Sequence, residues 1–329
     1  MKVKNWFQKC LMGILIAALC LTVVPVGTFA ATKSSLPALH VEGTKLCDKD
    51  GNVVQLRGVS THGLSWFPQY VNDKYFKELH DKWGANVVRL AMYTEEYNGY
   101  CSGDANNRKQ LKALVKKGVK LAAKNDLYVI IDWHILSDGN PKKHVKASKA
   151  FFKEMSKTFK DYDNVLYEIC NEPNGGTDWK TIKSYAKSVI PVIRKNDKDA
   201  IIIVGTPNWS QKVDEAAASP ITGYDNLMYA FHFYAGTHKA DMRKTLTDAV
   251  KKGLPVFVTE FGITDASGYG GIDKKEAAKW IKALNKRDIS YVAWNVSNKD
   301  EGSAMIKSSC AKTSGLKRSD LSTSGKWIY

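Results

Sequence analysis

The sequence has no apolar run long enough to cross a membrane. Its longest such run, residues 10–26, is shorter than the roughly 20 apolar residues that a spanning helix needs. Lysines precede this run, and the small-residue site Thr28-Phe29-Ala30 follows it. This pattern is typical of a secretory signal peptide. We therefore expect residues 1–30 to be removed, which predicts a secreted, extracellular protein with no stable membrane association after processing.

Cysteines are few, and their wide spacing resembles no metal knuckle. Four of them lie beyond the predicted cleavage site: Cys47, Cys101, Cys170 and Cys310. We therefore expect no zinc site, and no other pattern in the chain predicts a metal or a cofactor. An extracellular setting permits disulfides, but Cys170 lies in an apolar run and is typical of a small buried residue. The pairing of the four cysteines stays open.

Acidic residues are in the minority, with 33 Asp and Glu against 49 Lys and Arg, for a formal net charge of +16. The basic residues are mostly lysines spread along helix-like stretches such as residues 109–124, which is typical of a solvated surface. No basic segment is interleaved with stacking aromatics, so nucleic acid is not a predicted partner. Attraction to acidic wall or plant polymers stays open. We expect a monomer.

Short β-rich runs alternate with helical stretches along most of the chain. The predicted strands cover residues 55–60, 86–92, 128–133, 165–169, 201–205, 227–233, 256–260 and 291–295. The predicted helices cover residues 74–82, 108–125, 145–160, 179–195, 242–252 and 274–286. This alternation predicts a parallel sheet with crossover helices. No Gly-rich phosphate loop follows the first strand, so we predict a closed (β/α)8 barrel of the TIM type over an open doubly wound sheet.

The ends of the chain complete this domain organisation. After the signal peptide we expect a linker over residues 31–40 and one catalytic barrel over residues 41–329. Residues 45–54 have Asp-Gly turn chemistry and predict an N-terminal β-hairpin that caps the bottom of the barrel. Only residues 319–329 are left for a final helix, so a truncated chain or a lost downstream binding module stays an open alternative.

Polar residues at the carboxyl ends of barrel strands face the active site, and two carboxylates are among them, Glu172 and Glu260. Glycoside hydrolysis needs such a pair, one protonated and one ionised. In a barrel this narrow we expect a separation of about 5 Å, which allows a covalent glycosyl intermediate and retention of configuration. We expect Arg89 to keep Glu260 charged and His232 to regulate the proton of Glu172.

Two motifs resemble the signatures of glycoside hydrolase family 5: residues 169–175 (ICNEPNG) and residues 258–262 (VTEFG). The similarity runs from about residue 39 to the C-terminus and is closest to the bacterial endoglucanases of the second subfamily. It implies a retaining endo-β-1,4-glucanase, a cellulase, without a cofactor. In this resemblance Glu172 is the general acid/base and Glu260 is the nucleophile.

The resemblance also supplies supporting residues at matching positions. The remaining members of the catalytic set are Arg89, His134, Asn171, His232, Tyr234 and Trp294. Asn171 would donate to the sugar 2-hydroxyl, and Tyr234 would hydrogen-bond the nucleophile.

A β-glucan chain presents flat sugar faces edged by hydroxyls, so its cleft needs aromatic platforms and hydrogen-bonding groups. Residues that meet these needs are Trp66, Trp209 and Trp294 as platforms and His62, Tyr93, Lys299 and Glu301 as hydroxyl-binding groups. Relatives that act on mannan, xyloglucan or mixed-linkage glucan are the nearest alternatives, so the preferred polymer and processivity stay open. A sugar-binding protein without turnover is disfavoured because both carboxylates are present.

Overall fold

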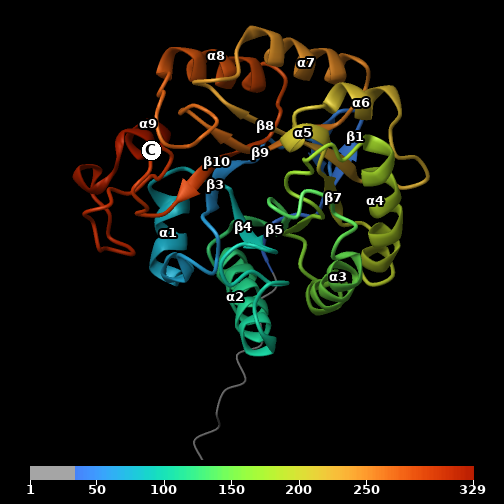
Figure 1. The fold of residues 1–329 in the computed structure, drawn as a ribbon, viewed down its shortest axis with the longest axis horizontal. Coiled ribbons are helices and arrows are strands. Elements are labelled where there is room, and N and C mark those ends of the chain that lie inside the picture. Colours follow the sequence, from blue (N-terminus) through green and yellow to red (C-terminus); the bar gives the residue numbers. More distant parts are fainter. Residues whose placement is uncertain (1–33) are drawn as a thin grey trace, which may run out of the picture. The chain divides into compact units, whose positions relative to one another are not determined.

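Eight parallel strands close into a barrel in the order β10-β3-β4-β5-β6-β7-β8-β9 (Figure 1). Their bounds are β3 Arg57–Thr61, β4 Val87–Tyr93, β5 Tyr128–His134, β6 Val165–Glu168, β7 Ile201–Val204, β8 Leu227–Tyr234, β9 Val256–Gly262 and β10 Tyr291–Val296. Each strand ends within two residues of its predicted bounds. The predicted (β/α)8 architecture is therefore confirmed.

The computed structural model describes residues 34–329. The predicted signal peptide, residues 1–30, and the first part of the predicted linker lie outside these described residues. Within residues 34–329, no helix is both long and apolar enough to cross a bilayer.

The helices surround the strands in Figure 1. The α-helices are α1 Asp73–Asp81, α2 Ala105–Lys124, α3 Val145–Phe159, α4 Trp179–Arg194, α5 Pro207–Ser210, α6 Val213–Ala218, α7 Ala240–Lys251, α8 Lys274–Asn285 and α9 Thr323–Ile328. Two 3-10 helices cover Pro68–Tyr70 (η1) and Arg318–Asp320 (η2). The six predicted helices are confirmed to within three residues at either end. The short helices α5 and α6 were not predicted.

Side-chain caps fix where several of these helices begin. Asn72, Asp104, Asp178, Asp273 and Ser322 each accept a hydrogen bond from a backbone amide in the first turn of the helix that follows. Such caps satisfy amide groups that have no partner within the helix. The polar residue before each apolar stripe therefore sets the start of the helix.

The N-terminal hairpin differs in detail from the predicted one. Its strands are β1 Leu39–Glu42 and β2 Lys45–Asp48, which pair antiparallel across a two-residue turn at Gly43, where φ is 57°. The predicted turn near residue 50 forms too, but it supports only one isolated bridge, between Cys47 and Val53. Strand β1 thus begins two residues inside the predicted linker.

The hairpin packs where the barrel strands begin. Leu39 and Leu46 belong to the same buried cluster as Val87, Tyr128 and Ile201, which lie at or near the first residues of β4, β5 and β7. This places the hairpin at the bottom of the barrel, as predicted, and leaves the opposite end of the strands open for a site.

The barrel interior changes from apolar to polar along the strands. In β4 and β5, Val87 and Tyr128 lie in the apolar bottom layer, and Arg89 and Asp132 are buried further along the same strands. Tyr93 and His134 end these two strands. Side chains two apart along a strand point to the same face, so the polar residues project inward near the carboxyl ends of the strands.

The four cysteines beyond the predicted signal peptide are free thiols within the described part of the chain. Cys47 and Cys170 are buried. Burial raises the pKa of the Cys170 thiol above its usual value, so this thiol stays protonated and inert, as expected of a small core residue.

Candidate active site

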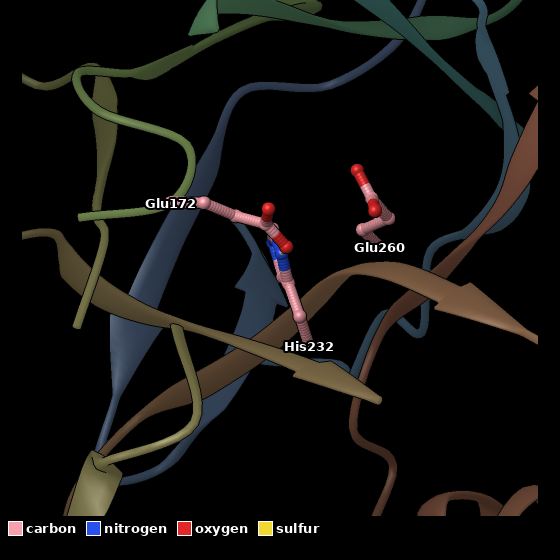
Figure 2. A group of neighbouring side chains, drawn as sticks. All are labelled: Glu172, His232 and Glu260. Carbon is pink, nitrogen blue, oxygen red and sulfur yellow. Dashed lines mark hydrogen bonds and ion pairs between the residues drawn. The ribbon is translucent and has the colours of Figure 1, made fainter. Parts of the chain in front are cut away.

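A cavity of about 590 Å³ opens at the carboxyl ends of the strands, and both predicted catalytic carboxylates line it. Glu172 lies in the loop after β6, and Glu260 lies within β9. One carboxylate oxygen of each, together with a nitrogen of His232, lies within 4.8 Å of the other two atoms. Figure 2 shows His232 next to Glu172, with Glu260 on the other side of a gap. This spacing agrees with the separation expected for a retaining glycosidase, about 5 Å.

Glu260 is held by two donors from different strands. The Tyr234 hydroxyl donates to Oε1 at 2.7 Å, and Nη1 of Arg89 donates to Oε2 at 3.2 Å. Burial and the nearby Glu172 carboxylate raise the pKa of Glu260, while His232 and Arg89 limit the rise. Arg89 therefore makes the expected contact but does not outweigh the effect of burial.

Glu172 is bonded to an imidazole. Nδ1 of His232 lies 2.8 Å from Oε1 of Glu172, and Nε2 lies 2.9 Å from the hydroxyl of Thr259. Burial alone would lower the pKa of His232, but its contacts with Glu168 and Glu172 raise it to about 9. His232 is thus positively charged at neutral pH and faces Glu172.

A buried layer of charged groups supports the two carboxylates from below. Arg89 donates through Nε to Glu168 at 2.7 Å, and its Nη2 lies 3.0 Å from Asp132. Burial would raise the pKa of Glu168, but Arg89 and His232 lower it to about 2. We did not predict Glu168 or Asp132 as site residues. The available signal was strand alternation, because Asp132 precedes His134 by two residues on the same face.

His134 and Asn171 belong to this supporting layer. Nδ1 of His134 lies 2.6 Å from Asp132, and the Asn171 amide lies 3.2 Å from Nε2 of His134 and donates to the Ile135 carbonyl at 3.0 Å. Burial and Arg89 lower the pKa of His134 to about 4, so this ring is neutral. Asn171 is fully buried and both its amide hydrogens face protein atoms. Its donation to a sugar hydroxyl stays a prediction.

Aromatic side chains form one wall of the cavity. His62, Tyr93 and Trp294 line it, and the Trp294 ring stacks on His134 with 5.3 Å between centroids. Trp66 packs against Tyr93 of this wall, with 4.9 Å between the ring centroids. Of the predicted site residues, Trp66, Arg89 and Asn171 do not line the cavity itself.

The opposite wall carries Trp209, because β7 lies four strands from β3 in the closed barrel. Trp209 is 44% exposed and lines the cavity. It sits in a left-handed turn in which Asn208, Trp209 and Ser210 all have φ between 55° and 57°. The turn is tied to the loop that carries Glu172, since the Trp209 amide donates to the Pro173 carbonyl at 3.0 Å.

The rim of the cavity is polar at the end of β10. Lys299 and Glu301 form an ion pair at 2.6 Å, and Nζ of Lys299 lies 5.5 Å from the centre of the Tyr269 ring. Lining residues that sequence reasoning missed are Leu136, Asn208, Gln211, His238, Ala266, Ser267, Gly268, Tyr269 and Ser303. They lie in segments that follow strands, Asn208 in α5 and the others in loops, and this position was the only signal that could have indicated them.

The cluster of Glu172, His232 and Glu260 has the spacing of possible metal ligands. Both nitrogens of His232 are already engaged by protein oxygens, however, which suits proton sharing better than coordination. The predicted absence of a metal or cofactor stays a prediction.

Taken together, the cavity holds two close carboxylates between aromatic walls. One carboxylate is held by a guanidinium and a phenol, and the other is bonded to an imidazole. On a (β/α)8 barrel, this arrangement defines the protein as a glycoside hydrolase.

The chain belongs to glycosyl hydrolase family 5, since the cellulase model of that family matches residues 47–300. Endoglucanase A of Butyrivibrio fibrisolvens is 50% identical over 88% of this chain and 67% of its own length. An endoglucanase of Clostridium saccharobutylicum is 46% identical over 98% of this chain and 72% of its own length. The resemblance to the second subfamily stays a prediction.

Solved structures agree with this assignment. The catalytic domain of Thermobifida fusca endoglucanase Cel5A, as a variant in complex with cellotetraose, has a TM-score of 0.83 and 40% identity. The alignment covers 88% of this chain and 95% of that chain.

Proposed function

We propose that the protein is a secreted endo-β-1,4-glucanase that hydrolyses internal bonds of cellulose and related β-glucans with retention of configuration. The observation that carries the proposal is the pair of carboxylate oxygens within 4.8 Å of each other in an aromatic-lined cavity. The similar proteins named endoglucanases support the substrate class. The signal-like residues 1–30 support secretion.

The reaction proceeds in two displacements. Glu260 attacks the anomeric carbon while Glu172 gives a proton to the departing glycosidic oxygen, and a covalent glycosyl intermediate forms. Glu172 then takes a proton from water, which attacks the anomeric carbon and releases Glu260. The Tyr234 hydroxyl and Arg89 orient Glu260 for the attack.

The glucan chain lies across the cavity between its two walls. Trp209 stacks on a sugar face at one side, and Trp294 and Trp66 form the platforms at the other. Lys299 and Glu301 bind sugar hydroxyls at the rim, together with His62 and Tyr93 of the aromatic wall in the same role. The protein acts as a monomer.

Chain cleavage of soluble polymers tests the proposal. Wild-type protein, Glu172→Gln and Glu260→Gln are compared on carboxymethyl-cellulose, barley β-glucan and mannan by viscosity. We expect a rapid fall in viscosity on the two glucans with wild type and none with either variant. Cleavage of mannan alone would overturn the substrate class, and glucan binding without any cleavage would instead support a sugar-binding protein.

A further inference from the structure

Thr259 lies beneath the site and connects the residues that hold Glu172 with those that hold Glu260. It directly precedes Glu260 in β9 and is fully buried. Its hydroxyl donates to Oε1 of Glu168 at 2.7 Å and lies 2.9 Å from Nε2 of His232. Glu168 in turn accepts from Arg89, which holds Glu260. A continuous chain of contacts thus runs beneath the two catalytic carboxylates.

The direction of each hydrogen bond in this chain is fixed by chemistry. Arg89 holds Glu168 in its ionised form, and an ionised carboxylate only accepts hydrogen bonds. The Thr259 hydroxyl has one hydrogen, and that hydrogen serves Glu168. The oxygen of Thr259 can therefore only accept from His232, so Nε2 of His232 carries a hydrogen.

We propose that Thr259, held by Glu168, is a positioning residue for the acid/base. It keeps a hydrogen on Nε2 of His232, so that a proton enters or leaves His232 only at Nδ1, against Glu172. This inference rests on the proposed role of Glu172 as acid/base and assigns no contact between Thr259 and the substrate.

The surroundings of His232 favour its charged form in this orientation. The charged groups that act on it are Glu168, Glu172, Glu260 and Asp132. Arg89 and His134 belong to the same buried network through their contacts with Asp132. His134 is neutral, and Arg89 is matched by its own ion pairs with Asp132, Glu168 and Glu260. An imidazolium with hydrogens on both nitrogens satisfies Thr259 and Glu172 at once. It also stabilises the carboxylate that Glu172 becomes after giving up its proton.

A neutral His232 ring with its only hydrogen on Nδ1 does not fit the same contacts. With a hydrogen on Nδ1 alone, Nε2 would offer a lone pair to Thr259, whose single hydrogen already serves Glu168. One buried hydrogen bond would then be lost, and a buried donor or acceptor without a partner is unfavourable. The Thr259 hydroxyl therefore selects the form of His232 that presents its variable proton to Glu172.

Paired substrates separate this role from a merely structural one. Cleavage of carboxymethyl-cellulose requires an acid, whereas dinitrophenyl cellobioside has a leaving group that departs without one. Thr259→Val removes the hydroxyl at equal size, and Thr259→Ser keeps it as the matched control. We expect Thr259→Val to lower kcat/KM about tenfold or more on the polymer and less than about threefold on the aryl glycoside. Thr259→Ser should stay within about threefold on both.

A second measurement uses the wild-type protein, so it does not depend on whether a variant folds. In wild type labelled with 15N-histidine, the Nε2 resonance of His232 should remain of the protonated type from pH 5 to 9, while Nδ1 alone titrates. Deprotonation of Nε2 in this range would overturn the proposal. Equal slowing of both substrates by Thr259→Val would overturn it as well.

The same substrates test the proposed function separately. Glu172→Gln should abolish polymer cleavage but spare kcat/KM on dinitrophenyl cellobioside. If Glu172→Gln slows both alike, the role of Glu172 itself is wrong, whatever Thr259 does.

Discussion

At the scale of single residues, the Tyr234 hydroxyl is the closer of the two donors to Glu260, the proposed nucleophile, at 2.7 Å from Oε1. This hydrogen bond favours the ionised form of Glu260, against the effect of burial. Tyr234→Phe should therefore raise the pKa of Glu260 further and shift the acidic limb of the kcat/KM profile to higher pH. We also expect kcat/KM at the optimum to fall by about 10- to 100-fold. An unshifted acidic limb would contradict this role.

Trp209 provides a test of substrate binding. Its ring is 44% exposed at the cavity, so Trp209→Ala should remove a stacking contact and raise KM on carboxymethyl-cellulose about three- to tenfold, with little change in kcat. Tyr329 offers a matched control, because it is 43% exposed but packs against Trp83 outside the cavity. A similar rise in KM for Tyr329→Ala would show that the effect does not come from the cleft.

The sequence allowed the residues that line the cavity to be predicted better than those beneath it. Glu172, Glu260 and Tyr234 could be proposed because each occurs at or near the carboxyl end of a strand. Glu168 and Thr259 are buried one layer lower. Strict alternation would point Thr259 away from the face of its neighbour Glu260, and the register shift in β9 just before Glu260 could not be foreseen. Their contact depends on closure of the barrel, which lets side chains from β6 and β9, three strands apart, meet in one narrow interior.

At the scale of elements, the strands and long helices were predictable because each combines a clear apolar period with a cap or turn residue. The first strand of the N-terminal hairpin, β1, was not predicted because residues 39–42 are only half apolar and follow a serine-containing segment. Helix α5 could not be foreseen, since its three left-handed residues follow from contacts with Asn171 and Pro173 rather than from helix propensity.

The cap of α4 allows a test at this scale. The Asp178 carboxylate accepts from the Thr181 amide at 2.8 Å, so Asp178→Ala should lower the free energy of unfolding by about 1 kcal/mol. Ser184 is exposed in the same helix, and Ser184→Ala should change this free energy by less than about 0.5 kcal/mol. Urea unfolding followed by circular dichroism measures both. Equal effects would mean that helix propensity, not the cap, governs α4.

At the scale of the whole molecule, the lysine-rich helices and the carboxylates of the cavity lie in different parts of the protein. Helices α2 and α4 contain no Asp or Glu, and α3 contains only Glu154, which pairs with Lys112 and Lys116 of α2. The cavity carries Glu172, Glu260 and Glu301 instead. The lysine-rich stretches thus form an outer helical surface, as predicted. The electrostatic field in the barrel mouth is set by the buried groups instead.

Those buried groups link the stability of the whole molecule to pH. The pKa of His232 is raised from 6.5 to about 9 in the folded state, so its contribution is fully present below pH 6.5 and is lost as the pH rises through 9. His62 and His134 have pKa values lowered to about 4, so they are neutral in the folded state throughout this range. Their release of protons in the unfolded state offsets part of the loss up to about pH 7.5, and above that pH they contribute no slope. We therefore expect the free energy of unfolding to fall by up to about 3 kcal/mol between pH 6.5 and 9.

Urea unfolding at several pH values in this interval measures that loss, with His232→Gln as the comparison. Desolvation also raises the pKa values of the Cys101 and Cys170 thiols, and their ionisation in the unfolded state lowers stability near pH 9. This second effect is the same in both proteins, so the difference in slope between them belongs to His232. The variant should be less stable than wild type at pH 6.5 and should lose less stability on the way to pH 9. Parallel slopes would mean that His232 is not charged in the folded protein, and the proton arrangement at Thr259 would then need a neutral ring with its hydrogen on Nε2.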